Sequence, residues 1–287
     1  MKAKIRGTEI YFDVAGMQLA PIGQDFEERP VLFLLHGGPG QDHLRFKQHS
    51  LALQDVAQLI FVDNRGCGRS KKTKKSEYTL ENNIEDIEAL RKYLGLEKIN
   101  VLGTSYGGIV AQGYAIRYSK HVDKLILVAT TSQYQAIEDA QKYLDEHASP
   151  EQIAIAKHLW NGTFKSHDHV MDFFTLFETV YSVTAKPKKR KPKPPKIHTV
   201  WSHEALNEGF GNFLRKLNLT PKLKKIKCPT LVLGGDKDWI LPAKYSKIIA
   251  ENIPNSELKI FKNCGHAIGV DAGPKYLKAV KKFLKTS

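Results

Sequence analysis

Short apolar runs recur along the chain and alternate with longer polar stretches of helical period. The runs lie at residues 31–37, 59–63, 99–103, 124–129, 230–234 and 257–263. Unbroken apolar character, rather than strict alternation, is typical of parallel strands that are covered on both faces. The pattern therefore predicts an α/β protein with a doubly wound, mostly parallel sheet.

Two local patterns add detail to this sheet. Residues 4–16 alternate around a Gly-Thr pair, which predicts an antiparallel hairpin at the edge of the sheet. Between residues 79 and 94, the apolar side chains from Ile84 to Leu94 fall on one helical face, and Gly95 follows as a stop. A helix of this kind between two buried strands is what a doubly wound sheet requires.

The alternation of strands and helices stops between residues 132 and 219. Only helical patterns occur there, at residues 133–146, 150–160, 168–181 and 201–217. An all-helical block between two strands of one sheet predicts a lid over the carboxyl ends of the strands, where open α/β sheets place their sites. We therefore expect a core of residues 1–131 and 220–287, interrupted by a helical lid of residues 132–219.

Charge is the unusual property of the composition. The 287 residues include 44 Lys and Arg against 30 Asp and Glu, a net charge of +14. Half of this excess lies in residues 186–196, KPKKRKPKPPK, a run typical either of an anion-binding patch or of a solvated, proline-stiffened loop. No aromatic side chains interleave the lysines, as a single-strand binder would need, so we favour the loop and expect no nucleic-acid partner.

The composition also excludes several classes of protein. With 41% hydrophobic residues the chain is not of a disordered class, and no run approaches the ~18–20 apolar residues of a spanning helix. No apolar stretch follows the charged amino terminus, so we expect no signal peptide. Three cysteines without CxxC spacing indicate neither a disulfide framework nor a zinc site. We expect a cytoplasmic protein without metal or cofactor, and its oligomeric state stays open.

Residues 103–107, GTSYG, match the G-x-S-x-G nucleophile elbow. The motif directly follows the apolar run 99–103 and directly precedes a helical run, and this strand–turn–helix context is the one that the elbow needs. Flanking glycines remove the β-carbons that would clash in the sharp turn, and the helix amino terminus directs N–H groups at a developing oxyanion. Ser105 is therefore the predicted nucleophile.

A nucleophilic serine needs a base, and the base needs an orienting carboxylate. His266 follows the last predicted strand, and two aspartates follow the strand before it. We favour Asp238 as the acid because of its spacing from Gly235 and Pro242, with Asp236 as the alternative and the turn residue. All of these positions fall at the rim of the sheet where the elbow lies.

An oxyanion hole for this serine would pair the N–H of Tyr106 with an amide from a loop after an earlier strand. The glycine-rich segment HGGPG, residues 36–40, follows the strand at 31–35 and fits that role. We predict Gly38 as the second donor. Gly37 is expected to contact the substrate, because a residue without a side chain lets the backbone come close.

Several motifs together resemble a known family: HGGPG (36–40), DNRGCGRS (63–70), GTSYGG (103–108), GGDKDWILP (234–242) and CGH (264–266). They are similar to the α/β-hydrolase superfamily, and most to its prolyl aminopeptidase (proline iminopeptidase) branch. The resemblance covers residues 5–131 and 220–285. It implies a Ser105–Asp238–His266 triad that attacks the carbonyl of an amino-terminal residue, while acidic side chains hold the free ammonium.

The chain departs from that branch in three places. The elbow contains GTSYGG where many relatives carry GGSWG, and Trp239 stands where some relatives have an acid. The lid resembles the family only at residues 207–210, NEGF, which are similar to an acidic lid segment of relatives. Glu208 is therefore the expected anchor for a substrate ammonium, and Glu204 lies one helical turn before it.

The sequence thus favours a cofactor-free serine hydrolase that acts on a short peptide or another small molecule, and most of all a proline iminopeptidase-like aminopeptidase. A carboxylesterase, lactonase or amidase with the same triad is the alternative within that class. A lidded ligand receptor that retains the triad is the alternative from another class. A third hypothesis is that the basic run at 186–196 makes the protein primarily a nucleic-acid or membrane binder.

Overall fold

The computed structural model describes residues 1–185 and 198–286, so the basic run at 186–196 lies outside the described residues. The strands are β1 (Lys2–Ile5), β2 (Thr8–Ala15), β3 (Leu19–Ile22), β4 (Asp25–Glu28), β5 (Val31–Leu35), β6 (Gln58–Val62), β7 (Ile99–Thr104), β8 (Val122–Val128), β9 (Thr230–Gly235) and β10 (Ser256–Phe261). The α-helices are α1 (Leu44–Ser50), α2 (Leu80–Tyr93), α3 (Tyr106–Arg117), α4 (Gln135–His147), α5 (Pro150–Asn161), α6 (His167–Leu176), α7 (His203–Gly211), α8 (Ala243–Asn252), α9 (Ile268–Asp271) and α10 (Gly273–Lys285). Short 3₁₀ segments are η1 (Leu51–Asp55), η2 (Lys75–Glu77), η3 (Ser119–His121), η4 (Phe213–Lys216) and η5 (Thr220–Lys225).

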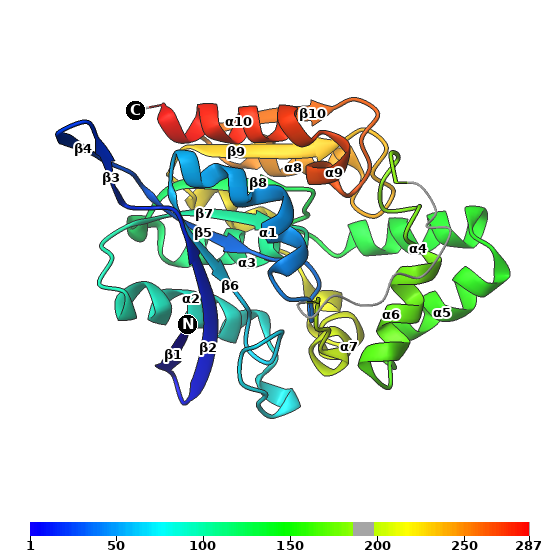
Figure 1. Cartoon of the computed structure of the whole chain (residues 1–287). Helices are drawn as coiled ribbons and strands as arrows, with labels where there is room; N and C mark the ends of the chain where they lie inside the picture. Colours follow the sequence, from blue (N-terminus) through cyan, green and yellow to red (C-terminus); the bar gives the residue numbers. More distant parts are fainter. Residues whose placement is uncertain (186–197, 287) are drawn as a thin grey trace.

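The main sheet has the order β1-β2-β6-β5-β7-β8-β9-β10 (Figure 1). The hairpin β1–β2 is antiparallel and joins β6 in antiparallel register at one edge. From β6 to β10 every neighbouring pair is parallel. The predicted mostly parallel sheet and its edge hairpin are therefore confirmed.

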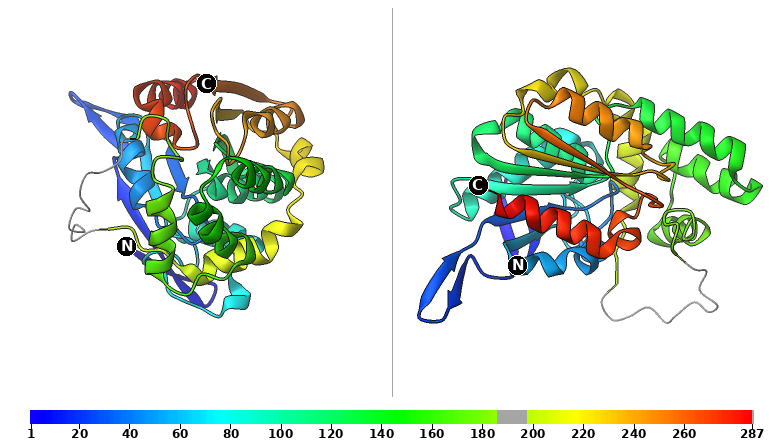
Figure 2. Two further views of the ribbon diagram at one scale, coloured as in Figure 1. Left: turned by 90° about the vertical axis from the view of Figure 1, so that its right-hand side faces the viewer. Right: turned by 90° about the horizontal axis from the view of Figure 1, so that it is seen from above.

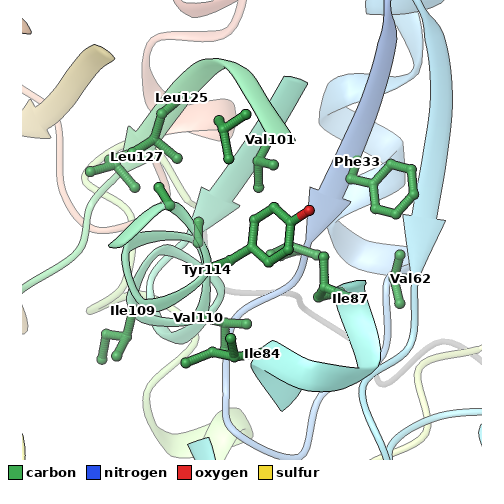
Figure 3. Packing of buried hydrophobic residues seen from close by; sticks show 14 of the residues in the cluster. Phe33, Val62, Ile84, Ile87, Val101, Ile109, Val110, Tyr114, Leu125 and Leu127 are labelled. Carbon is green, nitrogen blue, oxygen red and sulfur yellow. The ribbon is translucent and has the colours of Figure 1, made fainter. Parts of the chain in front are cut away.

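Side chains of β5 alternate between two apolar clusters, one on each face of the sheet. Phe33 and Leu35 join the cluster that includes residues of α2, α3 and α8, and Figure 3 shows Phe33 there near Tyr114 of α3. Leu32 and Leu34 join the cluster with residues of η1, α9 and α10. Both faces of the sheet are thus covered, which explains why the predicted strands are unbroken apolar runs.

The helix predicted at 79–94 is α2, and its start has a local cause. Thr79 lies in extended backbone before the helix, and its hydroxyl oxygen accepts a hydrogen bond from the N–H of Asn82. Such a cap satisfies one of the N–H groups that the first turn leaves without a partner.

A small second sheet, the hairpin β3–β4, was not predicted. Its mixed acidic and apolar sequence lies largely exposed, so it lacks the apolar run of a buried strand.

The helices between β8 and β9 share an apolar cluster of their own, with members from α4 to α7. Figure 1 shows α4, α5 and α6 together at one side of the sheet, and the views in Figure 2 agree. The two ends of this segment lie side by side: Tyr134 N–H donates to the Leu217 carbonyl (3.0 Å) and Leu219 N–H to the Ser132 carbonyl (2.7 Å). We call the described part of residues 132–219 the lid, and its boundaries stay a prediction.

Among the helices in residues 1–185 and 198–286, no helix has both the length and the apolar character that a membrane crossing needs.

Candidate active site

Ser105 lies in the sharp turn between β7 and α3. Its backbone has φ 53° and ψ −121°, a conformation that side chains with a β-carbon rarely adopt. The two neighbouring glycines have no room for a β-carbon: one at Gly103 would overlap the Gly107 carbonyl, and one at Gly107 would overlap the Leu35 carbonyl. The sequence around Ser105 thus permits a turn that lifts this hydroxyl above the carboxyl end of the sheet.

Three side chains from distant parts of the sequence form a line at this turn. The Nε2 atom of His266 lies 3.1 Å from Ser105 Oγ, and its Nδ1 atom lies 2.8 Å from Asp238 Oδ2. Asp238 is buried, and its other oxygen accepts hydrogen bonds from the N–H groups of Ile240 (3.0 Å) and Leu241 (2.9 Å). These bonds fix the carboxylate, which in turn fixes the imidazole ring toward Ser105.

The two competing aspartates have different partners. Asp236 directs Oδ1 to the N–H of Cys264 (3.2 Å), so it connects the turn after β9 to the turn after β10. Asp238 is the aspartate that reaches the His266 ring. The structure therefore brings Ser105, Asp238 and His266 together. Asp236 is not part of this line and contacts the backbone of Cys264 instead.

The segment HGGPG faces the elbow. A β-carbon at Gly37 would lie 3.3 Å from the Ser105 β-carbon, and Gly38 has a positive φ of 119°. Tyr106 is the first residue of α3, where N–H groups lack a partner within the helix. Its buried ring is held by Asn83, whose amide donates to the Tyr106 hydroxyl oxygen (2.6 Å). Gly37 and Gly38 thus line one cavity together with Ser105, and Tyr106 follows Ser105 directly in the chain.

Two cavities open from Ser105. The larger, of about 220 Å³, is lined by Gly37, Gly38, the lid aromatics Phe173, Phe174, Phe177, Tyr181, Trp201 and Phe210, and the segment from His266 to Val270. The smaller, of about 60 Å³, shares Gly38 and Ser105 with it and is lined by Tyr106, Ile109, Ile137, Trp160, Leu214 and Trp239 among others. Every described side chain of the smaller cavity is uncharged. The site therefore suits a substrate with an apolar group beside the reacting carbonyl.

One carboxylate that holds the loop of His266 was not predicted from the sequence. Asp271 accepts hydrogen bonds from Gly265 N–H (2.8 Å), Val183 N–H (3.1 Å) and the hydroxyl groups of Ser182 and Thr184. These donors come from both sides of the site, since Gly265 precedes His266 and the others belong to the lid. The adjacent lid residue Tyr181 packs edge-on against His266, with ring centroids 5.7 Å apart.

Replacing Asp271 with asparagine is expected to lower kcat about ten-fold, with a smaller change in KM. An asparagine NH₂ would face backbone N–H donors, and each donor left unsatisfied costs about 1–3 kcal/mol. Steady-state kinetics on an aryl ester checks this, with the exposed Asp25→Asn as the matched control. A kcat within two-fold of wild type would contradict a positioning role for Asp271.

The same contacts predict a pH dependence of stability. Burial alone would raise the pKa of Asp271, but hydrogen bonds from Ser182, Thr184 and the backbone outweigh it and lower this pKa. A carboxylate with a lowered pKa stabilises the fold above its unfolded pKa of about 4, and this contribution is lost as pH falls further. The unfolding free energies of wild type and Asp271→Asn should therefore converge below about pH 4.

The structure does not bring Glu208 to the wall of either cavity. Glu208 is half-buried on α7, between Leu206 and Phe210, which do line the larger cavity. Glu204 faces away, with its carboxylate 4.0 Å from Lys75 Nζ. Among the described residues, the acidic side chain that lines the larger cavity is Glu178, which was not singled out from the sequence and which has an interaction partner.

Residues 30–272 match the family described as alpha/beta hydrolase fold. The chain therefore belongs to the α/β-hydrolase family, and it is a hydrolase.

The relatives of this chain narrow the comparison to one branch of the family. The chain is 31% identical to a proline iminopeptidase, PfmaB, of Pestalotiopsis fici, over 96% of this chain and 99% of that one. It is 30% identical to the proline iminopeptidase of Lactobacillus helveticus, over 99% and 96% of the two chains. The resemblance to the proline iminopeptidase branch is thus confirmed.

Solved structures agree on the fold. The proline iminopeptidase of Mycobacterium smegmatis superimposes with a TM-score of 0.74 at 19% identity, over 99% of this chain and 97% of that one. An alpha/beta fold family hydrolase of Bacillus anthracis superimposes with a TM-score of 0.79 at 19% identity, over 99% and 98%. At this level of identity the likeness extends to the fold alone.

Proposed function

We propose that this hydrolase is a serine aminopeptidase of the proline iminopeptidase type, with Ser105, His266 and Asp238 as its catalytic triad. The observation that carries the proposal is the hydrogen-bonded line from Ser105 Oγ through His266 to Asp238. Relatives at about 30% identity over almost the whole chain support the choice of substrate class.

The geometry allows each step of acyl transfer. Ser105 Oγ attacks the substrate carbonyl while His266 Nε2 takes its proton, and Asp238 stabilises the imidazolium that results. The oxyanion receives hydrogen bonds from the N–H groups of Gly38 and Tyr106. His266 then protonates the leaving group, an acyl-enzyme remains on Ser105, and water releases it by the same steps in reverse. No step requires a metal or a cofactor.

A second candidate function is favoured by the smaller cavity. The residues that line it carry no charge, although an aminopeptidase must hold an ammonium group near the reacting carbonyl. A charge that loses water costs several kcal/mol unless a carboxylate meets it. A hydrolase of uncharged esters, lactones or amides needs no such partner, so it remains the alternative.

One experiment separates these candidates. Purified protein is assayed with paired panels of aminoacyl-arylamides and short-chain aryl esters, and Ser105→Ala serves as the blank. Turnover of prolyl- or alanyl-arylamides supports the aminopeptidase. Ester hydrolysis without any arylamide turnover would replace it with the second candidate, and no Ser105-dependent turnover would overturn the proposal as a whole.

The ammonium anchor has its own test. If Glu208 holds the ammonium, Glu208→Gln should raise KM for prolyl-arylamides at least about ten-fold and leave N-blocked or ester substrates nearly unchanged, since only the charged substrate loses a partner. Glu204→Gln is the matched control from the same helix. A selective rise with Glu178→Gln instead would move the anchor to Glu178, and equal effects on both substrate types would remove Glu208 from this role.

We also propose the cytoplasm as its compartment and a short peptide or another small molecule as its substrate. The three cysteines are buried and unpaired, which fits a reducing environment. Burial raises the pKa of Cys67 to about 12, so this thiol stays protonated and unreactive at neutral pH.

A further inference from the structure

The two cavities at Ser105 divide the substrate into an acyl side and a leaving-group side. Among the described residues, His266 and the segment after it line the larger cavity but not the smaller, whereas Tyr106 lines the smaller but not the larger. A general acid must contact the atom that it protonates, which belongs to the leaving group. The leaving group therefore lies in the larger cavity, and the acyl group extends into the smaller, uncharged one.

Arg45 supplies a positive charge to the leaving-group side. It lies on α1, just after the HGGPG loop, and it lines the larger cavity with an exposed side chain. It makes no ion pair or hydrogen bond with any residue of 1–185 or 198–286. Arg65, by contrast, is paired with Asp86, 2.7 Å away. An unpaired guanidinium at a cavity wall is free to bind a ligand.

The charge of Arg45 acts on two other residues that line the larger cavity. Burial raises the pKa of Tyr181, and the positive charge of Arg45 opposes that rise. Tyr181 is the residue whose ring packs against His266. Burial lowers the pKa of His49, another residue of this cavity, and Arg45 lowers it further. Glu178 lines the same cavity but already has an interaction of its own.

We propose that Arg45 forms a subsite for a carboxylate on the leaving group, so that the enzyme prefers substrates whose leaving group is an anion. Among peptides, such a substrate is a dipeptide with a free carboxyl terminus. Among esters, it is one whose leaving group is a hydroxy acid. A guanidinium suits this role because its planar fork donates two parallel hydrogen bonds to a carboxylate. The inference rests on the proposed function, because the roles of Ser105 and His266 define the leaving-group side.

The test compares leaving groups that differ in charge but not in shape. Butyrate esters of 3-hydroxybenzoate and 3-hydroxybenzamide are assayed with wild type, Arg45→Gln and Arg45→Lys. Each rate is divided by the rate of alkaline hydrolysis of the same ester. Lys98→Gln is the matched control, since Lys98 is exposed and lies next to the amino end of β7, at the opposite end of the sheet. The dipeptide Pro-Ala and its C-terminal amide form a second pair.

In wild type, kcat/KM should favour the carboxylate of each pair by about five-fold or more, a modest factor because the side chain is exposed. Arg45→Gln should bring the ratio to about one, Arg45→Lys should retain part of it, and Lys98→Gln should leave it unchanged. An equal loss with Lys98→Gln would assign the preference to the overall charge of the protein and overturn the subsite. So would a ratio that Arg45→Gln does not change.

The two pairs also separate this inference from the proposed function. If neutral esters are hydrolysed through Ser105 but no ratio depends on Arg45, the subsite is wrong and the hydrolase mechanism stands. If neither dipeptide is cleaved while the ester ratio falls in Arg45→Gln, the aminopeptidase is wrong and the subsite is supported.

Discussion

Replacing Ser105 or His266 with alanine is expected to lower kcat by about 10⁴-fold or more, with the fold retained. The two side chains act in one proton transfer, so the loss of either one removes the attack on the carbonyl. For the same reason the double variant should be scarcely slower than either single variant. Steady-state kinetics on an aryl ester measures these effects, and circular dichroism and thermal unfolding check the fold.

A serine-directed phosphonate adds an independent readout. It should label wild-type protein at Ser105 and leave Ser105→Ala unlabelled, as peptide mass spectrometry would detect. Activity of Ser105→Ala above about 1% of wild type, or labelling at another serine, would contradict the assignment of the nucleophile.

The two aspartates after β9 should differ by orders of magnitude in their effect on kcat. Asp238→Asn keeps an oxygen to accept the N–H groups of Ile240 and Leu241. Its amide would donate to His266 Nδ1 and impose the wrong tautomer, so we expect kcat to fall by about 10³-fold or more. Asp236→Asn keeps an acceptor for Cys264 N–H and should lower kcat by no more than about ten-fold.

These variants test the acid separately from the fold. Both replace a carboxylate with an amide of the same shape in the same turn, so a general loosening of that turn would affect both alike. Equal losses in kcat, or a larger loss with Asp236→Asn, would show that Asp238 is not the orienting acid.

The sheet could be predicted because each of its central strands has a recognisable pattern in its own short stretch of sequence. The central strands are buried on both faces, so each one appears in the sequence as a continuous apolar run, and the glycines around Ser105 reveal the sharp turn. The hairpin β3–β4 escaped prediction for the opposite reason. Much of Leu19, Ile22 and Phe26 is exposed, so no buried face shapes the pattern of this segment.

Parts of the site could not be predicted because they depend on contacts between remote segments. Asp271 is recognisable as a positioning residue only when Ser182 and Thr184, 87 or more positions away, are seen to donate to it. Arg45 and Glu178 carry no motif, and their place on the cavity wall follows from how the lid and α1 pack. Glu208 is the opposite case. It was predicted from its short segment that resembles the family, but it does not line either cavity.

The hydrogen bonds from Tyr134 to Leu217 and from Leu219 to Ser132 hold the two ends of the segment between β8 and β9 next to each other. Because its two ends are adjacent, the distance that it spans does not depend on its length or internal structure. Insertions, deletions or a wholesale exchange within this segment can therefore accumulate without moving β8, β9 or the groups that they position. A chimera joined at these two positions would keep Ser105, His266 and Arg45 of one parent and take the lid walls of both cavities from the other. It would work only with hydroxyl donors to Asp271 where Ser182 and Thr184 stand.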